Sequence, residues 1–344
     1  MRRIAAAVLI FLVGLLTAAA AGWGVLALRF AVPLDDDRRM GFVAAFAVLA
    51  LLTLAALFSR RWRWPALAVF SLAFAAVLHR YLSLEPSNQR DWQADVSVLP
   101  YATVRGDLVS VHNIRNFDYR SETDYTPAYY DKTFDMRALE GADLVSVYWM
   151  GPAIAHTFLS FSFAGGDHLA ISIETRKEKQ EAYSAVKGFF RQYEIFYVVA
   201  DERDVIRLRT NYRRDPPEDV YLYRVQAPPG DVRRVFLEYL KEINSLKEAP
   251  AFYNTLTSNC TTDIWYLSLV NPRHLPFSWK ILASGYLPEY LYEAGRLDTS
   301  VEFAELRRRG HVNTRALAAD SAPDFSLRIR QWDAPAAHGA SPAK

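Results

Sequence analysis

Three long apolar runs near the N-terminus constrain the fold of this chain more than any other feature of its sequence. Residues 4–28 and 41–58 contain no charged side chain, and residues 65–82 contain none until their last four positions. Each run has roughly 18–25 residues, which is enough for a helix to cross the hydrocarbon core of a bilayer. The sequence therefore predicts a membrane anchor over residues 1–86 with three transmembrane helices.

The arginines that flank these runs give a small charge asymmetry. Two precede the first run and three lie between the second and third, whereas three lie between the first and second. Because basic residues favour the inner side of a membrane, we expect the N-terminus inside and everything after the third run outside. Alternatively, Arg2-Arg3, the first run and Ala18–Ala21 form a cleavable signal peptide, although the apolar continuation to Leu28 argues against cleavage. Cleavage would leave two spans and the same outer position for the C-terminal part.

The composition of the whole chain excludes several classes of function. With 40 Lys and Arg against 38 Asp and Glu, the formal net charge is +2, so no global attraction to nucleic acid is expected. One cysteine excludes an internal disulfide framework and a multi-cysteine metal site, and the seven histidines contain no H-E-x-x-H pair. Phosphate-binding glycine motifs are missing as well. We expect no cofactor, no metal and no nucleic-acid partner, and the oligomeric state is left open.

After about residue 91 the composition changes to mixed charge with alternating apolar residues. This pattern predicts an α+β domain over residues 91–310, with an antiparallel sheet packed by helices. Strands are expected at residues 142–150, 153–163, 169–175, 195–200, 205–209 and 220–226, and helices at residues 177–194, 231–246, 260–270 and within 278–296. The Ala-, Pro- and Ser-rich residues 311–344 are expected to be a disordered tail.

The stretch that leads into Cys260 is the most informative motif. Ser258 and Asn259 are good helix-capping residues, and an apolar stripe follows them, so Cys260 is expected in the first turn of a helix. The exposed N–H groups and the dipole of a helix start favour a thiolate, which is how a reactive cysteine is made. The alternative is an inert, buried cysteine that acts as a small apolar residue. An unpaired thiol in an exported domain favours the nucleophile.

A base for this thiol is expected on the hairpin formed by residues 153–174. The two apolar faces match if paired residue numbers sum to 330 or 332. The first register sets His156 directly across from Glu174, and the second makes Glu174 a diagonal neighbour. His156 could then take the thiol proton while Glu174, or alternatively Ser172, orients the imidazole. In the structural alternative His156 is a histidine at the edge of the core and Glu174 pairs with Arg176.

Other residues are weaker candidates. The Asn259 side chain could stabilise an oxyanion together with the Cys260 N–H, and Tyr253 and Asn254 could line the site or pack the turn. Five charged residues are expected to be solvated on strands and turns: Glu194, Glu202, Asp204, Arg207 and Arg209.

These motifs together resemble the Lnb N-terminal periplasmic domain family. The similar stretches are Ala155–Phe161, Ser172–Arg176, Tyr193-Glu194, Tyr221–Tyr223 and Phe252–Thr262, and the resemblance covers roughly residues 109–297. Having the histidine before the cysteine also resembles a circularly permuted papain-like (NlpC/P60-like) arrangement. The resemblance implies a bacterial periplasmic domain, and this chain departs from the family pattern by its three predicted spans. Together they lead us to expect a multi-pass protein of the bacterial inner membrane with its soluble domain in the periplasm. It further implies that Cys260 is a nucleophile and His156 its base, in a lipoprotein transacylase-type reaction through an acyl-cysteine. The assignment of Glu174 as third member comes from the hairpin geometry.

Three functions follow from this reading. The first is a membrane-anchored thiol acyltransferase, or a hydrolase, that acts on the acyl chains of membrane lipid or lipoprotein. The second is a cell-wall amidase or cysteine peptidase that uses the same dyad. The third is a non-catalytic, membrane-anchored binding or assembly module in which Cys260 is merely buried.

Overall fold

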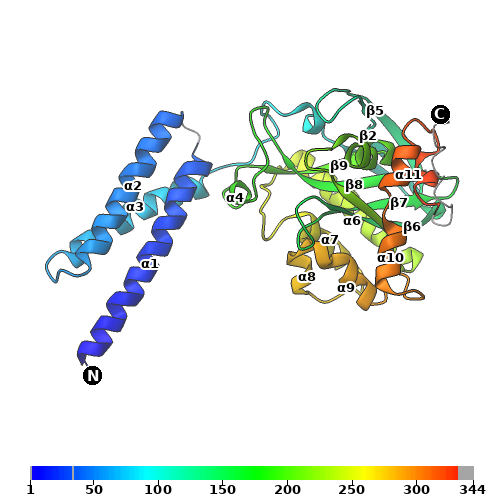
Figure 1. Cartoon of the computed structure of the whole chain (residues 1–344). Helices are drawn as coiled ribbons and strands as arrows, with labels where there is room; N and C mark the ends of the chain where they lie inside the picture. The colour runs from blue at the N-terminus through cyan, green and yellow to red at the C-terminus, as the bar shows by residue number, and fades with distance from the viewer. Residues whose placement is uncertain (1, 33–34, 332–344) are drawn as a thin grey trace, which may run out of the picture. The chain divides into compact units, whose positions relative to one another are not determined.

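The computed structural model describes residues 2–32 and 35–331 (Figure 1). The chain forms two compact units. The first, called the anchor unit, is the described part of Met1–Ser87 together with Ala182–Glu194 and Phe252–Thr255. The second, called the sheet unit, is the described remainder of the chain. Each unit is considered by itself.

The anchor unit is built from the predicted apolar helices. They are α1 (Arg2–Ala31), α2 (Asp36–Ala56) and α3 (Arg63–Leu82), and each is long and apolar enough to cross a membrane. Asp35 begins α2 by accepting a hydrogen bond from the Arg38 N–H, which satisfies one of the free donors of the first turn. The rings of Phe46 and Phe70 pack against each other between α2 and α3. The apolar helices expected from the sequence are confirmed.

The helix predicted for residues 177–194 is wrong. The stretch contains only the short helix α4 (Ala185–Gly188), and Arg191 then takes a left-handed backbone conformation with a φ of 55°. Its guanidinium donates hydrogen bonds to the carbonyl oxygens of Tyr81 and Leu82 at the end of α3. Helix ends leave such carbonyls unpaired, so this interaction with α3 replaces the continuation of a local helix.

The sheet unit contains a mixed β-sheet with strand order β1-β2-β9-β8-β7-β6-β10, and β5 pairs with β2 beside this path. Its strands are β1 (Tyr101–Arg105), β2 (Leu108–Arg115), β5 (Tyr129–Asp135), β6 (Leu139–Tyr148), β7 (His156–Phe163), β8 (Asp167–Arg176), β9 (Glu194–Ala200) and β10 (Asp219–Arg224). A separate ribbon pairs β3 (Asp118–Tyr119) with β4 (Tyr125–Thr126). The expected sheet was antiparallel, but β2 and β9 run parallel because the chain reaches β9 by a long crossover.

The hairpin of β7 and β8 has the first of the two expected registers. Leu159 pairs with Ile171 and Phe163 pairs with Asp167, so paired numbers sum to 330. The turn between the strands contains Gly165 and Gly166, both with φ near +90°, a conformation that side-chain-bearing residues rarely adopt. The turn and the apolar pattern therefore select the same register.

Helices cover both faces of the sheet, which gives the predicted α+β class (Figure 1). They are α5 (Glu202–Arg207), α6 (Pro229–Glu248), α7 (Cys260–Ser268), α8 (Trp279–Leu282), α9 (Leu287–Glu293), α10 (Phe303–Gly310), α11 (Asn313–Ala318) and α12 (Phe325–Arg328). On one face Phe161 of β7 packs against Phe236 and Tyr239 of α6. On the other face Phe158 belongs to a buried cluster with residues of α5, α11 and α12.

The strand predicted at residues 205–209 is wrong. This stretch completes α5 and continues into a π-helical turn, Leu208–Tyr212. Asp201 caps the helix by accepting from the Arg203 N–H, and acidic residues follow in the first turn, where the helix dipole favours them. The charged residues interpreted as a turn between strands are therefore a helix start.

The disordered tail predicted from residue 311 is wrong for residues 311–331. Val312 and Ala316 of the α11 region and Phe325 and Ile329 around α12 are buried in the core of the sheet unit. Arg330 forms ion pairs with buried acidic groups of β6 and α5. The small apolar residues recur every three or four positions, so this alanine-rich stretch has a core-facing side despite its composition. Residues 332–344 lie outside the described residues.

Candidate active site

Helix α7 holds Cys260 in its first turn. Asn259 has an extended backbone, and its side-chain oxygen accepts hydrogen bonds from the N–H groups of Thr261 and Thr262 at 3.0 Å each. The Thr262 hydroxyl in turn accepts from the Asn259 N–H at 2.9 Å, which completes a capping box. These bonds fix where the helix starts and therefore fix the position of the cysteine.

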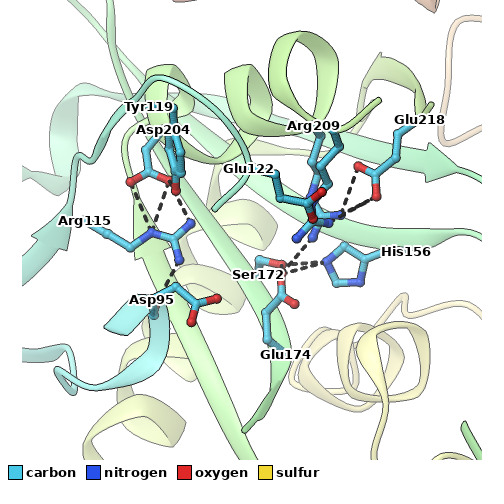
Figure 2. Close-up of polar contacts among 11 residues, drawn as sticks. Asp95, Arg115, Tyr119, Glu122, His156, Ser172, Glu174, Asp204, Arg209 and Glu218 are labelled. Atoms are coloured by element: carbon cyan, nitrogen blue, oxygen red, sulfur yellow. Dashed lines mark hydrogen bonds and ion pairs between the residues drawn. The ribbon is translucent and has the colours of Figure 1, made fainter. Parts of the chain in front are cut away.

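The β7–β8 hairpin holds His156 next to Ser172 and Glu174 (Figure 2). The Nε2 atom of His156 lies 2.7 Å from the Ser172 hydroxyl and 3.2 Å from Glu174 Oε1. Ser172 donates its hydroxyl proton to the same carboxylate oxygen at 2.9 Å. Because that hydroxyl is a donor to Glu174, it acts as an acceptor for an Nε2–H of His156. Both residues expected as alternative partners of the imidazole thus contact it together.

The thiol of Cys260 lies close enough to His156 and Thr157, at the start of β7, for both residues to affect its pKa. Burial by itself would raise the pKa of the thiol, but the hydrogen bond to His156 and the charge of His156 outweigh burial and lower the pKa. Burial and the positive charge of Arg209 would both lower the pKa of His156. The negative charge of Glu174 outweighs these two effects and raises the pKa of His156 to about 9. Both shifts favour a thiolate beside an imidazolium.

Arg209 is a member of this cluster that the sequence did not reveal. Its Nη2 donates to Glu174 Oε1 at 2.9 Å, and its Nη1 lies 3.4 Å from the carboxylate of Glu218 (Figure 2). Glu218 also pairs with Arg213 at 3.1 Å. Burial raises the pKa of Glu174, but the charges of His156 and Arg209 outweigh it and hold the pKa well below its usual range. The carboxylate beside His156 therefore stays ionised.

The expectation of solvated charges between residues 194 and 209 is wrong. The side chains of Glu194, Glu202, Asp204, Arg207 and Arg209 are all buried. Their partners come from elsewhere in the chain, as Arg330 does for Glu202 and Arg115 does for Asp204. Asp201 is the sequence signal that could have prevented this error, because an aspartate at this position is a good helix cap and predicts a helix. The solvent exposure of these charges had been inferred from a strand pattern, which does not apply to a helix.

A second buried ion pair lies beside the first cluster in Figure 2. Asp204 accepts hydrogen bonds from the Arg115 guanidinium, from the Tyr119 hydroxyl at 3.1 Å and from the Phe117 N–H at 2.7 Å. These bonds satisfy the carboxylate and join β2 to α5. We interpret this ion pair as structural, since the polar atoms of both side chains form hydrogen bonds with other protein groups.

The remaining candidates are placed differently. Asn259 acts as the helix cap, and its expected oxyanion role stays a prediction. Tyr253 and Asn254 belong to the anchor unit, where the Tyr253 N–H donates to the Tyr193 carbonyl oxygen at 2.9 Å. Within the described residues, no group of three or more His, Cys, Asp or Glu side chains is arranged to hold a metal ion.

Residues 125–285 match the family model of the Lnb N-terminal periplasmic domain. The matched residues include Cys260, His156, Ser172, Glu174 and Arg209. No curated protein and no solved structure matches the chain. Together with the apolar helices of the anchor unit, the match makes this a membrane protein with a periplasmic domain. The permuted papain-like arrangement stays a prediction.

Arg209→Met should strongly destabilise the sheet unit. The substitution leaves the carboxylates of Glu174 and Glu218 without their shared guanidinium in a buried place, and breaking such a pair typically costs about 3–5 kcal/mol. Thermal unfolding of the full-length protein in detergent, followed by near-ultraviolet circular dichroism, should show a midpoint lower by about 10 °C.

Arg308→Met is the matched control for this variant. Arg308 pairs with Glu305 on the exposed surface of α10, so its loss should change the midpoint little. Equal unfolding midpoints for the two variants would contradict the idea that the buried ion pairs of Arg209 stabilise the fold. Adding Glu218→Gln to Arg209→Met should recover part of the loss, because it removes a buried carboxylate that would keep only Arg213 as its cationic partner.

Proposed function

We propose that this protein is a membrane-anchored thiol acyltransferase, or an acyl hydrolase, that acts on lipid or lipoprotein at the periplasmic face of the inner membrane. The observation that carries the proposal is the position of the Cys260 thiol, at a capped helix start, near an imidazole that is itself bonded to Ser172 and Glu174. A nucleophile, a base and a group that orients the base are the parts that covalent catalysis requires.

In the first half-reaction the Cys260 thiolate attacks the carbonyl carbon of an acyl ester. The new C–S bond forms a tetrahedral oxyanion, and its collapse breaks the ester C–O bond. The imidazolium of His156 gives its proton to the departing alkoxide, which leaves as an alcohol and leaves a thioester on Cys260. Because Nε2 is bonded to Ser172 and Glu174, Nδ1 is the ring nitrogen that serves the thiol.

In the second half-reaction an amine or a water attacks the thioester carbonyl. Neutral His156 takes the proton of the attacking group, the C–S bond breaks, and the thiolate returns. An amine gives an amide and therefore transfer, whereas water gives a free acid and therefore hydrolysis. Glu174 keeps its negative charge throughout, which stabilises the imidazolium each time it forms.

The apolar helices of the anchor unit support a lipid-like substrate. A protein held in the bilayer meets lipid and lipoprotein at a high effective concentration without additional contacts. This advantage would be lost on a soluble substrate.

The test is incubation of the full-length protein, in nanodiscs of ether-linked lipid, with a synthetic diacyl lipopeptide. Mass spectrometry should detect either a lipopeptide that has lost one acyl chain or one that has gained an N-acyl group. No product from diacyl lipopeptide or from ester phospholipid would reject the proposal. Release of muropeptides from purified cell wall in place of these products would assign the dyad to amide cleavage.

A further inference from the structure

An apolar pocket of about 150 Å³ lies in the sheet unit beside the helix that carries Cys260. Its floor is formed by Ala142 and Leu144 of β6 and by Leu159 and Phe161 of β7, which are paired across the two strands. Side chains of α6, α7 and α9 form its walls. We call this cavity the α7 pocket. Its volume equals that of an engineered protein cavity that stays dry and binds benzene.

The pocket lies along the seam between α7 and β7, and Thr261, the residue that follows Cys260, is part of its lining. On the strand, Thr157 contacts the Cys260 thiol, while Leu159 and Phe161 are the next residues on the same face and line the pocket. On the helix, Ile264 and Ser268 follow Cys260 at intervals of four and also line it. Eight helical residues rise about 12 Å and four strand residues span about 13 Å, so the lining positions of the two elements extend over similar lengths.

The two ends of the pocket differ in polarity. The lining near the thiol is Ile264, Leu159 and Ile281, with Thr261, whose hydroxyl donates to the Ile281 carbonyl at 2.7 Å. The charged and strongly polar lining gathers at the other end of α7: Asp231, Asn271, Arg273, His274 and Arg296. These residues contact one another there, as the hydrogen bond from Asn271 Nδ2 to the Asp231 carbonyl shows. A ligand that enters from the thiol therefore meets apolar walls first and charge last.

We propose that the α7 pocket binds the alkyl part of the transferred acyl chain, with the acyl carbon at Cys260 and the chain directed along α7. This inference rests on the proposed function and adds the site and length preference of its substrate. Each additional methylene of the acyl chain that is buried in the pocket should increase the rate of Cys260 acylation by about fourfold, until the chain fills the pocket. Since the cavity holds about six carbons, the gain stops at about that length.

The first experiment measures the rate of Cys260 acylation by p-nitrophenyl esters from acetate to decanoate, using full-length protein in nanodiscs of ether-linked lipid. For the wild type, the p-nitrophenol burst should quicken by up to about fourfold per methylene to about hexanoate and then level off. Ala142→Leu adds three carbons to the pocket floor and should slow acylation by octanoate at least about tenfold, with acetate unchanged.

Two further variants keep this experiment decisive. Ser268→Leu fills the pocket from the opposite wall and should give the same loss if Ala142→Leu fails to fold. Ala318→Leu makes the same kind of enlargement at an exposed position of α11 and should keep the wild-type length profile. Equal rates for all chain lengths, or pocket variants that behave like Ala318→Leu, would overturn the pocket assignment.

The second experiment separates the pocket from the chemistry. A medium-chain fatty acid with a terminal diazirine is photolysed with wild-type protein and with Cys260→Ala, and labelled peptides are mapped by mass spectrometry. Labels within residues 264–275 and 287–296 in both proteins support the pocket. If these labels occur but no ester acylates Cys260, the proposed function fails while the acyl-chain site stands. If Cys260 is acylated but labels fall only on α1–α3, the site is wrong and the proposed function stands.

Discussion

Cys260→Ala should abolish the covalent acyl-enzyme and reduce product formation by at least about 10⁴-fold. In the proposed reaction every productive event passes through a thioester on this sulfur, so no partial route remains once the thiol is removed. Intact-mass measurement of the full-length protein after incubation with p-nitrophenyl butyrate should show one added acyl group in the wild type and none in the variant. Cys260 is the only cysteine in the sequence, so a hydroxylamine-labile adduct has one possible site.

The alanine variant should fold normally, which makes its loss of activity informative. The start of α7 is held by bonds between Asn259, Thr261 and Thr262, and none of these uses the cysteine side chain. Its unfolding midpoint should therefore be close to that of the wild type. Full product formation by Cys260→Ala, or an adduct on another residue, would refute the nucleophile and favour a non-catalytic binding or assembly module.

His156→Gln should raise the pKa of Cys260 and slow its alkylation at neutral pH. In the wild type the hydrogen bond and charge of His156, together with hydrogen bonding by Thr157, outweigh burial of the thiol, whereas in the variant only Thr157 remains to oppose the rise in pKa that burial causes. The rate of iodoacetamide alkylation against pH should have its inflection below the ordinary ~8.5 in the wild type and above it in the variant. At pH 7 each unit of this displacement slows alkylation about tenfold.

Loss of the base should also reduce acyl transfer by about 10²- to 10⁴-fold. His168→Gln is the matched control, because this histidine lies at the turn of the same hairpin and its Nδ1 contacts the Gly166 carbonyl oxygen. It should leave both the alkylation profile and the transfer rate unchanged. Identical profiles for wild type and His156→Gln would show that the imidazole does not control the thiol and would contradict the proposed dyad.

Several parts of the site could be predicted because they depend on neighbouring residues. The apolar runs of α1, α2 and α3 follow from hydropathy and length. The start of α7 follows from the capping chemistry of Asn259, and the position of His156 across from Glu174 follows from a period-two pattern and a glycine turn. These signals are local, so the sequence alone carries them.

Predictions failed where long-range contacts outweighed local pattern. The stretch before Glu194 lost its predicted helix because Arg191 binds the end of α3 instead. Residues 311–331 have a composition typical of a flexible tail, yet Phe325 and Ile329 are covered by a distant part of the core. In each case the decisive partner is far away in sequence and leaves no signal in the local composition.

The sequence by itself therefore determined the apolar helices, the capped helix that begins with Cys260 and the hairpin that presents His156 and Glu174. Only the tertiary structure decided that these pieces meet, although Cys260 and His156 lie about a hundred residues apart. It also added Arg209 to the cluster and formed the α7 pocket from elements that are far apart in the sequence. The physical reason is that capping and strand register depend on residues a few positions apart, whereas burial, charge pairing and cavity shape depend on how distant elements pack.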